Sequence, residues 1–284
     1  ISIFPWLKYL PHTKKFKELL KGSEIRDSIT RKFFEEHIQT FNPEKLRDLT
    51  DNLLYLSQNK EMWQDAGFEK VTQLQLESII NSIFVAGIET SLSTLRWMLI
   101  YLFHNPKIQN KIYNELYTNL GPKHQITTED MRSLPYTQAV LHETNRYAST
   151  LPLSIPHKTT VDTSVAGLSV PKGTQVLFNL YSMHHDPTHW DEPEKFKPER
   201  WLNPDGNLKK EKVSHYLPFS TGTRVCLGER LAKMQMFLIV TKLFLTFEVE
   251  LAPGEKVPDM KEGNIGITLE PRDDFKVILK PRKH

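Results

Sequence analysis

The apolar positions in the first third of the chain recur at helical spacing, which predicts a mainly helical protein. Residues 12–40 show this spacing loosely, and a second helix is expected to begin near Asn42, with Pro43 at its first position. Residues 71–104 contain no proline and one glycine, and they are apolar on more than one face. They predict a central helix about 50 Å long that is buried through the middle of the protein.

Further helices are indicated by the proline and glycine residues at their ends. Pro106 opens one helix that stops at Gly121, another follows Pro135, and a third follows Cys226. Residues 184–212 are rich in proline, glycine and charge, so an irregular surface segment is expected there.

Between residues 151 and 180 the pattern changes to β-branched runs that are broken by turn residues. Ala166-Gly167 and Pro171-Lys172-Gly173 indicate turns between short strands. Two tail segments, FEVEL and FKVILK, predict a closing pair of strands around a loop at residues 261–264. The expected fold class is therefore mainly α with small β-sheets.

Composition and charge narrow the class of protein. Lys and Arg number 37 against 34 Asp and Glu, a net charge of +3, which is too balanced to indicate nucleic acid as a partner. A single cysteine can form no internal disulfide, and no stretch reaches the roughly 18 to 20 uncharged apolar residues of a membrane span. The chain begins with Ile1 rather than Met, so we expect it to be a fragment.

The one cysteine, Cys226, lies in a glycine-rich bend ahead of an apolar helix. The N-terminus of that helix would direct free N–H groups at the sulfur and favour the thiolate. Gly222 and Gly228 let a flat group approach the backbone, and Arg224 can bind carboxylates. This combination suits a haem with its propionates. A buried cysteine that acts as a small hydrophobe and a cysteine hydrolase with a histidine base are the alternatives.

The segment FSTGTRVCLG has the form F-x-x-G-x-R-x-C-x-G, with Phe219, Gly222, Arg224, Cys226 and Gly228 in register. It resembles the haem-binding signature of the cytochrome P-450 family, whose members are haem-thiolate monooxygenases. The resemblance implies that Cys226 binds the iron of haem b and that the other four residues surround the cofactor.

Three further motifs follow the order and the separations of that family. ETNR (143–146) resembles its E-x-x-R, PERW (198–201) its P-E-R-F, and AGIETS (86–91) a segment of its long central helix. The resemblance covers nearly the whole chain and implies the cytochrome P-450 fold in one incomplete domain, 1–284. The family's N-terminal part, with its membrane anchor, first sheet strands and several helices, is expected to be missing.

The charges of the ETNR motif lie three residues apart on one helical face, so they can pair. A surface ion pair of little energetic worth is one explanation. The resemblance instead implies a buried structural triad of Glu143, Arg146 and Arg200 that locks the segment around the cysteine loop. Trp201 replaces the family's usual Phe, and we expect it to keep an aromatic anchor with only local repacking.

Gly87 is unusual because glycine in a helix interior costs about 0.5–1 kcal/mol relative to alanine. Approach of a planar ligand, or tight packing on another helix, would explain it. Glu89 and Thr90 are polar residues in an otherwise apolar helix. The resemblance implies that they are a catalytic pair beside bound dioxygen, with Ala86 and Gly87 against the haem. A back-bonded threonine and a salt-bridged Glu89 are the alternative.

His157 lies in a predicted strand, where a histidine often has no special role. The resemblance implies that it lies near a haem propionate. It also implies that the segments STLPLS and GNIGIT, together with Ala86, border the substrate cavity.

Thiolate-bound haem favours O–O cleavage, and electrons must come from a partner because the chain has no flavin or nicotinamide fingerprint. The resemblance implies NADPH-cytochrome P-450 reductase, with cytochrome b5 as a candidate second partner, and a place on the cytosolic face of the endoplasmic reticulum membrane. Five cations flank the cysteine loop and could form a docking face or a solvated charge run: Lys209, Lys210, Lys212, Arg230 and Lys233.

Several stretches look most like the animal microsomal group of this family that contains steroid 17-alpha-hydroxylase/17,20-lyase. They include IFPWLKYLP and KGTQVLFNLYSMHHD. The implied substrate is a lipophilic small molecule, with a steroid favoured over a xenobiotic or aryl hydrocarbon. The Glu89–Thr90 pair favours a monooxygenase over a haem-thiolate isomerase or dehydratase, and the chain shows no second soft ligand typical of an electron-transfer protein. A haem-binding fragment without activity is a further alternative.

Overall fold

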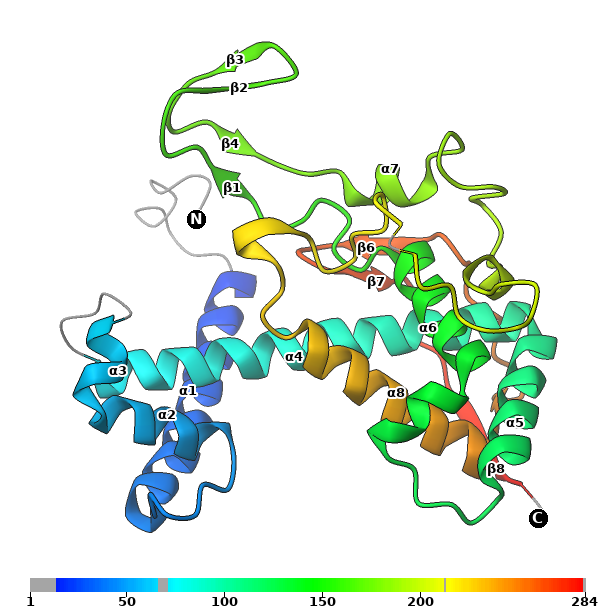
Figure 1. Ribbon diagram of the computed structural model, residues 1–284, viewed down its shortest axis with the longest axis horizontal. Coiled ribbons are helices and arrows are strands. Elements are labelled where there is room, and N and C mark those ends of the chain that lie inside the picture. Colours follow the sequence, from blue (N-terminus) through cyan, green and yellow to red (C-terminus); the bar gives the residue numbers. More distant parts are fainter. Residues whose placement is uncertain (1–13, 66–70, 212, 283–284) are drawn as a thin grey trace. The chain divides into compact units, whose positions relative to one another are not determined.

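The structure is a computed structural model, and it describes residues 14–65, 71–211 and 213–282 (Figure 1). The chain divides into two compact units between Ala86 and Gly87. This division falls inside helix α4 (Gln73–His104), which is the predicted central helix. The expectation of one incomplete domain over the whole chain stays a prediction.

The first unit contains α1 (Lys14–Thr40), α2 (Leu49–Gln58), α3 (Lys60–Asp65) and the beginning of α4. Its small core is built from apolar residues of α1, α2 and α4, namely Phe34, Leu54 and Leu76.

The predicted start of the second helix near Asn42 is wrong. The side chain of Asn42 accepts a hydrogen bond from the N–H of Glu44, 2.9 Å away, which forms a local turn instead of a helix cap. The cap is Asp48, whose carboxylate accepts from the N–H of Asp51 at 3.1 Å. The cap was expected at Asn42, but the side chain of that residue forms the turn and Asp48 caps the helix instead.

The second unit holds the remainder of α4 and most of the other helices. They are α5 (Pro106–Leu120), α6 (Pro135–Ala148), α7 (Leu180–His185) and α8 (Glu229–Thr246), with short 3₁₀ helices η2 (Thr128–Ser133), η3 (Pro198–Trp201) and η4 (Gly222–Arg224). The proline and glycine signals predicted the boundaries of α5 and the start of α6 correctly. The main core joins α4, α5, α6 and α8 through residues such as Trp97, Ile112, Val140 and Phe237.

Helix α4 is not buried along its whole length, which corrects the expectation from its composition. Trp97, Met98 and Ile100 are buried in the main core, whereas Ile88 and Leu92 are half exposed. Among the described residues, α4 is the one helix that is long and apolar enough to cross a membrane. Its burial in the core from Trp97 onward is typical of a central helix of a globular fold.

The strands in the described part of the chain form two-stranded antiparallel sheets. β1 (His157–Lys158) pairs with β4 (Gln175–Val176), and β2 (Thr163–Val165) pairs with β3 (Leu168–Val170) around Gly167 at φ 81°. The predicted closing pair is β5 (Phe247–Leu251) with β8 (Val277–Pro281). The mainly α fold with small sheets is thus confirmed.

The predicted loop at residues 261–264 is partly wrong, because β6 (Gly263–Ile265) begins there and pairs with β7 (Leu269–Pro271). A Cβ at Gly263 would lie 2.7 Å from the carbonyl oxygen of Glu270 and 3.1 Å from the Trp97 ring. Glycine is therefore needed for close strand approach and not for a turn.

Candidate functional site

The cysteine loop, residues 217–228, folds on itself immediately before α8. The N–H of Cys226 donates to the carbonyl of Phe219 at 2.9 Å, and the N–H of Ser220 donates to the carbonyl of Leu217 at 3.0 Å. The N–H of Glu229 then donates to the carbonyl of Cys226 as the helix begins. These backbone hydrogen bonds fold the loop, and Cys226 is exposed.

Glycine has two different uses in the cysteine loop. Gly222 takes φ +77°, a left-handed conformation that strains other residues, and a Cβ there would meet nothing within 4 Å. Gly228 is the N-cap of α8, and a Cβ on it would lie 4.0 Å from the sulfur of Cys226. The sulfur therefore lies beside the N-terminus of α8, where the helix dipole stabilises an anion.

The other predicted cofactor residues lie on separate elements. Arg224 is exposed in η4, and the described residues give its guanidinium no hydrogen bond or ion pair. Phe219 is half-buried, with the Nζ of Lys233 5.4 Å from its ring centre. His157 in β1 is half-buried and packs edge-on against Phe178, with 5.3 Å between ring centres.

These groups fit a haem by their chemistry. Cys226 offers an exposed thiol for iron, Arg224 offers a cation to a carboxylate, and the space at Gly222 is open. Large apolar side chains are exposed on the second unit, as expected around an apolar macrocycle. They include Val225 and Leu227 on the cysteine loop, Leu231 on α8, and Ile88 and Leu92 on α4.

The predicted catalytic pair lies on α4, next to the β6–β7 turn. Glu89 is exposed, and its carboxylate accepts a hydrogen bond from the hydroxyl of Thr268 at 2.8 Å. Thr90 is half-buried and its carbonyl accepts from the hydroxyl of Thr94 at 2.8 Å. Glu89 is thus held by a hydroxyl rather than by the salt bridge of the alternative. A Cβ at Gly87 would meet nothing within 4 Å, so packing against another helix does not explain this glycine.

Glu143, Arg146 and Arg200 meet in one buried network. The guanidinium of Arg146 binds Glu143 through both carboxylate oxygens, at 2.9 and 2.8 Å, and both side chains are 0% exposed. Arg200 donates to the same carboxylate at 3.1 Å, and so does the N–H of Lys197 at 2.9 Å. The Glu143–Arg146 pair is therefore not a surface ion pair, because both side chains are buried and the carboxylate is hydrogen-bonded by several donors.

Two tryptophans complete this network, and the sequence interpretation missed their roles. The indole N–H of Trp201 donates to Glu143 at 3.0 Å, and the ring of Trp190 lies 5.2 Å from the guanidinium carbon of Arg146. The sequence offered one clue to the role of Trp201, because the N–H of a buried indole usually has a hydrogen-bond acceptor. A phenylalanine at position 201 could not make this bond, so more than local packing depends on Trp201.

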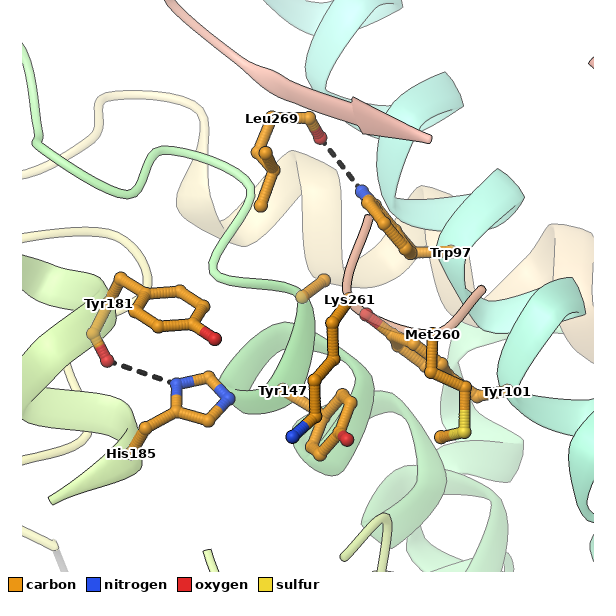
Figure 2. Close-up of a pocket in the computed structure, with 9 residues that line it drawn as sticks. Trp97, Tyr101, Tyr147, Tyr181, His185, Met260, Lys261 and Leu269 are labelled. Atoms are coloured by element: carbon orange, nitrogen blue, oxygen red, sulfur yellow. Dashed lines mark hydrogen bonds between the residues drawn. The ribbon is translucent and has the colours of Figure 1, made fainter. Parts of the chain in front are cut away.

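A small cavity lies beside the network in the main core, and Figure 2 shows the side chains that line it. Trp97 donates to the carbonyl of Leu269 at 2.8 Å, and the Nδ1 of His185 lies 3.0 Å from the carbonyl of Tyr181. The cavity measures about 10 Å³, which is room for one water molecule. It cannot hold a macrocycle, and it is separate from the cysteine loop.

Comparisons with known proteins agree with this geometry. The family model described as Cytochrome P450 matches residues 1–277. Steroid 17-alpha-hydroxylase/17,20 lyase of Squalus acanthias is 39% identical over 284 residues, covering 100% of this chain and 55% of the relative. The protein of the same name from Ictalurus punctatus is 37% identical, covering 99% of this chain and 54% of the relative.

A solved structure also matches. It is a zebrafish cytochrome P-450 with progesterone, at a TM-score of 0.84 and 37% identity, covering 95% of this chain and 60% of that one. The chain thus spans about half the length of the curated relatives it matches. The match of the family model over nearly the whole chain, together with a cysteine loop that exposes its thiol, shows that this chain belongs to the cytochrome P-450 family.

Proposed function

We propose that the full-length protein is a haem-thiolate monooxygenase that inserts one atom of O₂ into a lipophilic substrate. The observation that carries this proposal is the exposed thiol of Cys226 beside the N-terminus of α8. Haem b, when bound through that sulfur, supplies the redox chemistry for cleaving dioxygen.

The residues of the chain itself bind and orient the cofactor in this proposal. Cys226 is the iron ligand, and the backbone bond from its N–H to Phe219 holds the sulfur in place. Arg224 and His157 bind the propionates, which suits a guanidinium without a protein partner in the described part of the chain. Gly222 and Gly228 allow the loop to lie close to the macrocycle. Ala86 and Gly87 of α4 are further residues that we assign to cofactor binding.

Glu89 and Thr90 are the proposed proton-handling pair. The hydroxyl of Thr268 holds one carboxylate oxygen of Glu89, while the side chain itself is exposed. An exposed carboxylate can exchange protons with water, and a neighbouring hydroxyl can pass them on.

The favoured substrate is a steroid. This rests on the names of the relatives in Squalus acanthias and Ictalurus punctatus and on the progesterone in the matching structure. The exposed Ile265 at the end of β6 and Ile267 in the β6–β7 turn, with Leu153 and Ile155, suit the border of an apolar cavity. A xenobiotic or aryl-hydrocarbon substrate is the second candidate, because these residues are apolar without being specific for a steroid.

The electron donor that we propose is NADPH-cytochrome P-450 reductase, with cytochrome b5 as a candidate second partner, at the cytosolic face of the endoplasmic reticulum membrane. Lys209, Lys210 and Arg230 are exposed and flank the cysteine loop in the sequence, and they suit an acidic partner. Lys233 is a weaker candidate because it bonds Glu229 at 2.6 Å. Lys212 lies outside the described residues.

A carbon monoxide difference spectrum of the reduced full-length protein tests the proposed function. We expect the band of a thiolate-bound haem in the wild type and its loss in Cys226→Ser, because a hydroxyl is a much weaker acid than a thiol and does not supply the anionic sulfur ligand. Glu229→Gln, a change in the same region that leaves the sulfur intact, is the control and should keep the band. An unchanged spectrum in Cys226→Ser would mean that this sulfur is not the ligand.

Titration of the same protein with steroids and with planar aromatic compounds separates the two substrate classes. Spectral shifts with steroids at lower concentration than with aromatics would support the steroid assignment, and the reverse order would support the second candidate.

A further inference from the structure

His184 joins the buried Glu143–Arg146 network to the cysteine loop. It is the fifth residue of α7, which packs against α6, and its side chain is 0% exposed. The N–H of Leu217 donates to its Nε2 at 3.1 Å, so Nε2 carries no proton. The proton is therefore on Nδ1, which donates to the hydroxyl of Ser149 at 2.8 Å.

The opposite side of His184 is held by Arg146. The guanidinium of Arg146 donates to the carbonyl of His184 at 2.7 Å, and the hydroxyl of Ser149 donates to the carbonyl of Arg146 at 2.9 Å. Ser149 lies at the end of α6 with φ 42°, a left-handed conformation in which its hydroxyl reaches both partners. The backbone carbonyl and the imidazole of His184 are thus both hydrogen-bonded to residues at the end of α6, namely Arg146 and Ser149.

Leu217 is the first residue of the cysteine loop. Its carbonyl accepts from the N–H of Ser220, and the carbonyl of Phe219 accepts from the N–H of Cys226. A second histidine reinforces this point of attachment, because the Nδ1 of His142 lies 3.1 Å from the hydroxyl of Tyr216, the residue before Leu217. The position of the loop is therefore set, ahead of its glycines, by contacts to the buried imidazole of His184 and the half-buried imidazole of His142.

The surroundings of His184 keep its ring neutral. Burial, together with the smaller effects of the nearby His185, Arg146 and His215, lowers the pKa of His184 to about 3. A protonated ring would place an N–H against the N–H of Leu217. The neutral Nδ1–H form is the one that can accept from Leu217 and donate to Ser149 at the same time.

We propose that His184 is a positioning residue for Cys226. Its carbonyl is held by Arg146 of the Glu143–Arg146 network and its Nε2 holds the N–H of Leu217, so it connects that network to the backbone of the cysteine loop. This inference rests on the proposed function, in which the sulfur of Cys226 is the haem ligand.

A matched pair of substitutions separates the two hydrogen bonds of His184. In His184→Gln the terminal amide reaches the place of Nε2, so its oxygen can still accept from Leu217. In His184→Asn the shorter amide reaches the place of Nδ1 and can bond Ser149 but not Leu217. Ser149→Ala removes the hydroxyl alone and leaves the imidazole in place, which keeps the test open if His184→Asn folds poorly.

Two measurements on the full-length holoprotein decide the proposal. We expect amide hydrogen exchange in residues 216–226 to be about tenfold faster in His184→Asn than in the wild type, the effect of losing one backbone hydrogen bond. In His184→Asn and in Ser149→Ala, the reduced carbon monoxide complex should show a weaker thiolate band, because a fraction of the molecules loses the bond between the sulfur and the haem iron. His184→Gln should retain both the slow amide exchange in residues 216–226 and the thiolate band of the wild type.

The outcomes distinguish this inference from the proposed function. If the wild type has the thiolate band and His184→Asn matches it in band and exchange, His184 does not position the loop. If Gln and Asn are equally impaired, the residue acts through packing alone and the proposal is wrong. If the wild type lacks the thiolate band, the proposed function fails, and the exchange measurement still reports on the contact to Leu217.

Discussion

Individual buried side chains in this protein are matched by specific partners, and Trp201 is the clearest case. Its indole N–H donates to Glu143, a carboxylate that also binds Arg146 and Arg200. The sequence predicted that Glu143, Arg146 and Arg200 would meet, but it treated Trp201 as an aromatic of suitable size. Periodicity and motif spacing carry no information about where an N–H points, so only the folded arrangement revealed this bond.

Trp201→Phe should destabilise the protein by about 1–3 kcal/mol, because a buried carboxylate loses one of its donors. Chemical denaturation of the full-length protein measures this. Trp190→Phe is the matched control, since it removes an indole N–H bonded to the neutral carbonyl of Met183 at 3.0 Å. We expect a smaller loss from that bond, about 0.5–1.5 kcal/mol. Equal losses in the two variants would show that the charge of Glu143 adds nothing to the contact with Trp201.

Among the elements, α6 organises the parts of the second unit that support the cysteine loop. Glu143 on α6 binds Arg200 of η3 and the N–H of Lys197 before it, and Arg146 binds the carbonyls of His184 and Lys195. The ion pair of α6 thus holds segments that are distant in sequence. The motif predicted the pair, whereas the carbonyl partners have no sequence signal because every residue has a carbonyl.

Glu143→Ala should leave the buried guanidinium of Arg146 and the mostly buried guanidinium of Arg200 without their anion, a loss of about 3–5 kcal/mol. We expect the purified variant to retain little haem, because the segments around the cysteine loop lose their attachment to α6. The ratio of haem absorbance to protein absorbance measures this. Glu250→Ala, which breaks the exposed pair with Lys280, is the control and should retain normal haem. Normal haem content in Glu143→Ala would refute the locking role.

For the molecule as a whole, buried histidines make stability depend on pH. Burial lowers the pKa of His142 to about 4 and that of His184 to about 3, whereas both would titrate near 6.5 in the unfolded chain. The unfolded state therefore binds more protons below about pH 6.5, so the free energy of unfolding must fall as the pH is lowered to about 4. His37 has the opposite sign because Asp48 raises its pKa, so its contribution is lost as the pH rises above about 6.5.

We expect the free energy of unfolding to drop by about 1.4 kcal/mol per pH unit for each of these buried histidines below about pH 6. Urea denaturation at a series of pH values gives the slope. His184→Gln should reduce it, because glutamine does not titrate. A slope that is the same in the variant would exclude His184 as a source of the pH dependence.

The distribution of charge near the cysteine loop gives a prediction about electron transfer. The exposed Lys209, Lys210 and Arg230 should attract an acidic reductase, and such attraction between exposed charges is screened by salt. The rate of reduction by the proposed NADPH-cytochrome P-450 reductase should therefore fall as the ionic strength is raised. In Arg230→Gln the same rate should fall less steeply with ionic strength. A rate that is independent of salt would place docking elsewhere.

The sequence alone was sufficient for the helical class, for the ends of α5 and, through the motif around Cys226, for the cytochrome P-450 family. These features depend on local chemistry, namely helical periodicity, proline and glycine at helix ends, and a short run of specific residues. The start of α2 was predicted wrongly because the side chain of Asn42 forms a local turn and Asp48 caps the helix, and β6 was taken for a loop because Gly263 serves a strand contact.

The tertiary structure decided which polar atoms meet across distant segments. Thr268 holds Glu89 from 179 positions away, and Leu217 donates to His184 from 33 positions away. Burial makes such contacts necessary, since an unpaired polar group in the interior is costly, but only packing determines which partner lies within reach. The motif therefore predicts Cys226 as the iron ligand, while the contacts that hold the cysteine loop in position became evident only once the chain was folded.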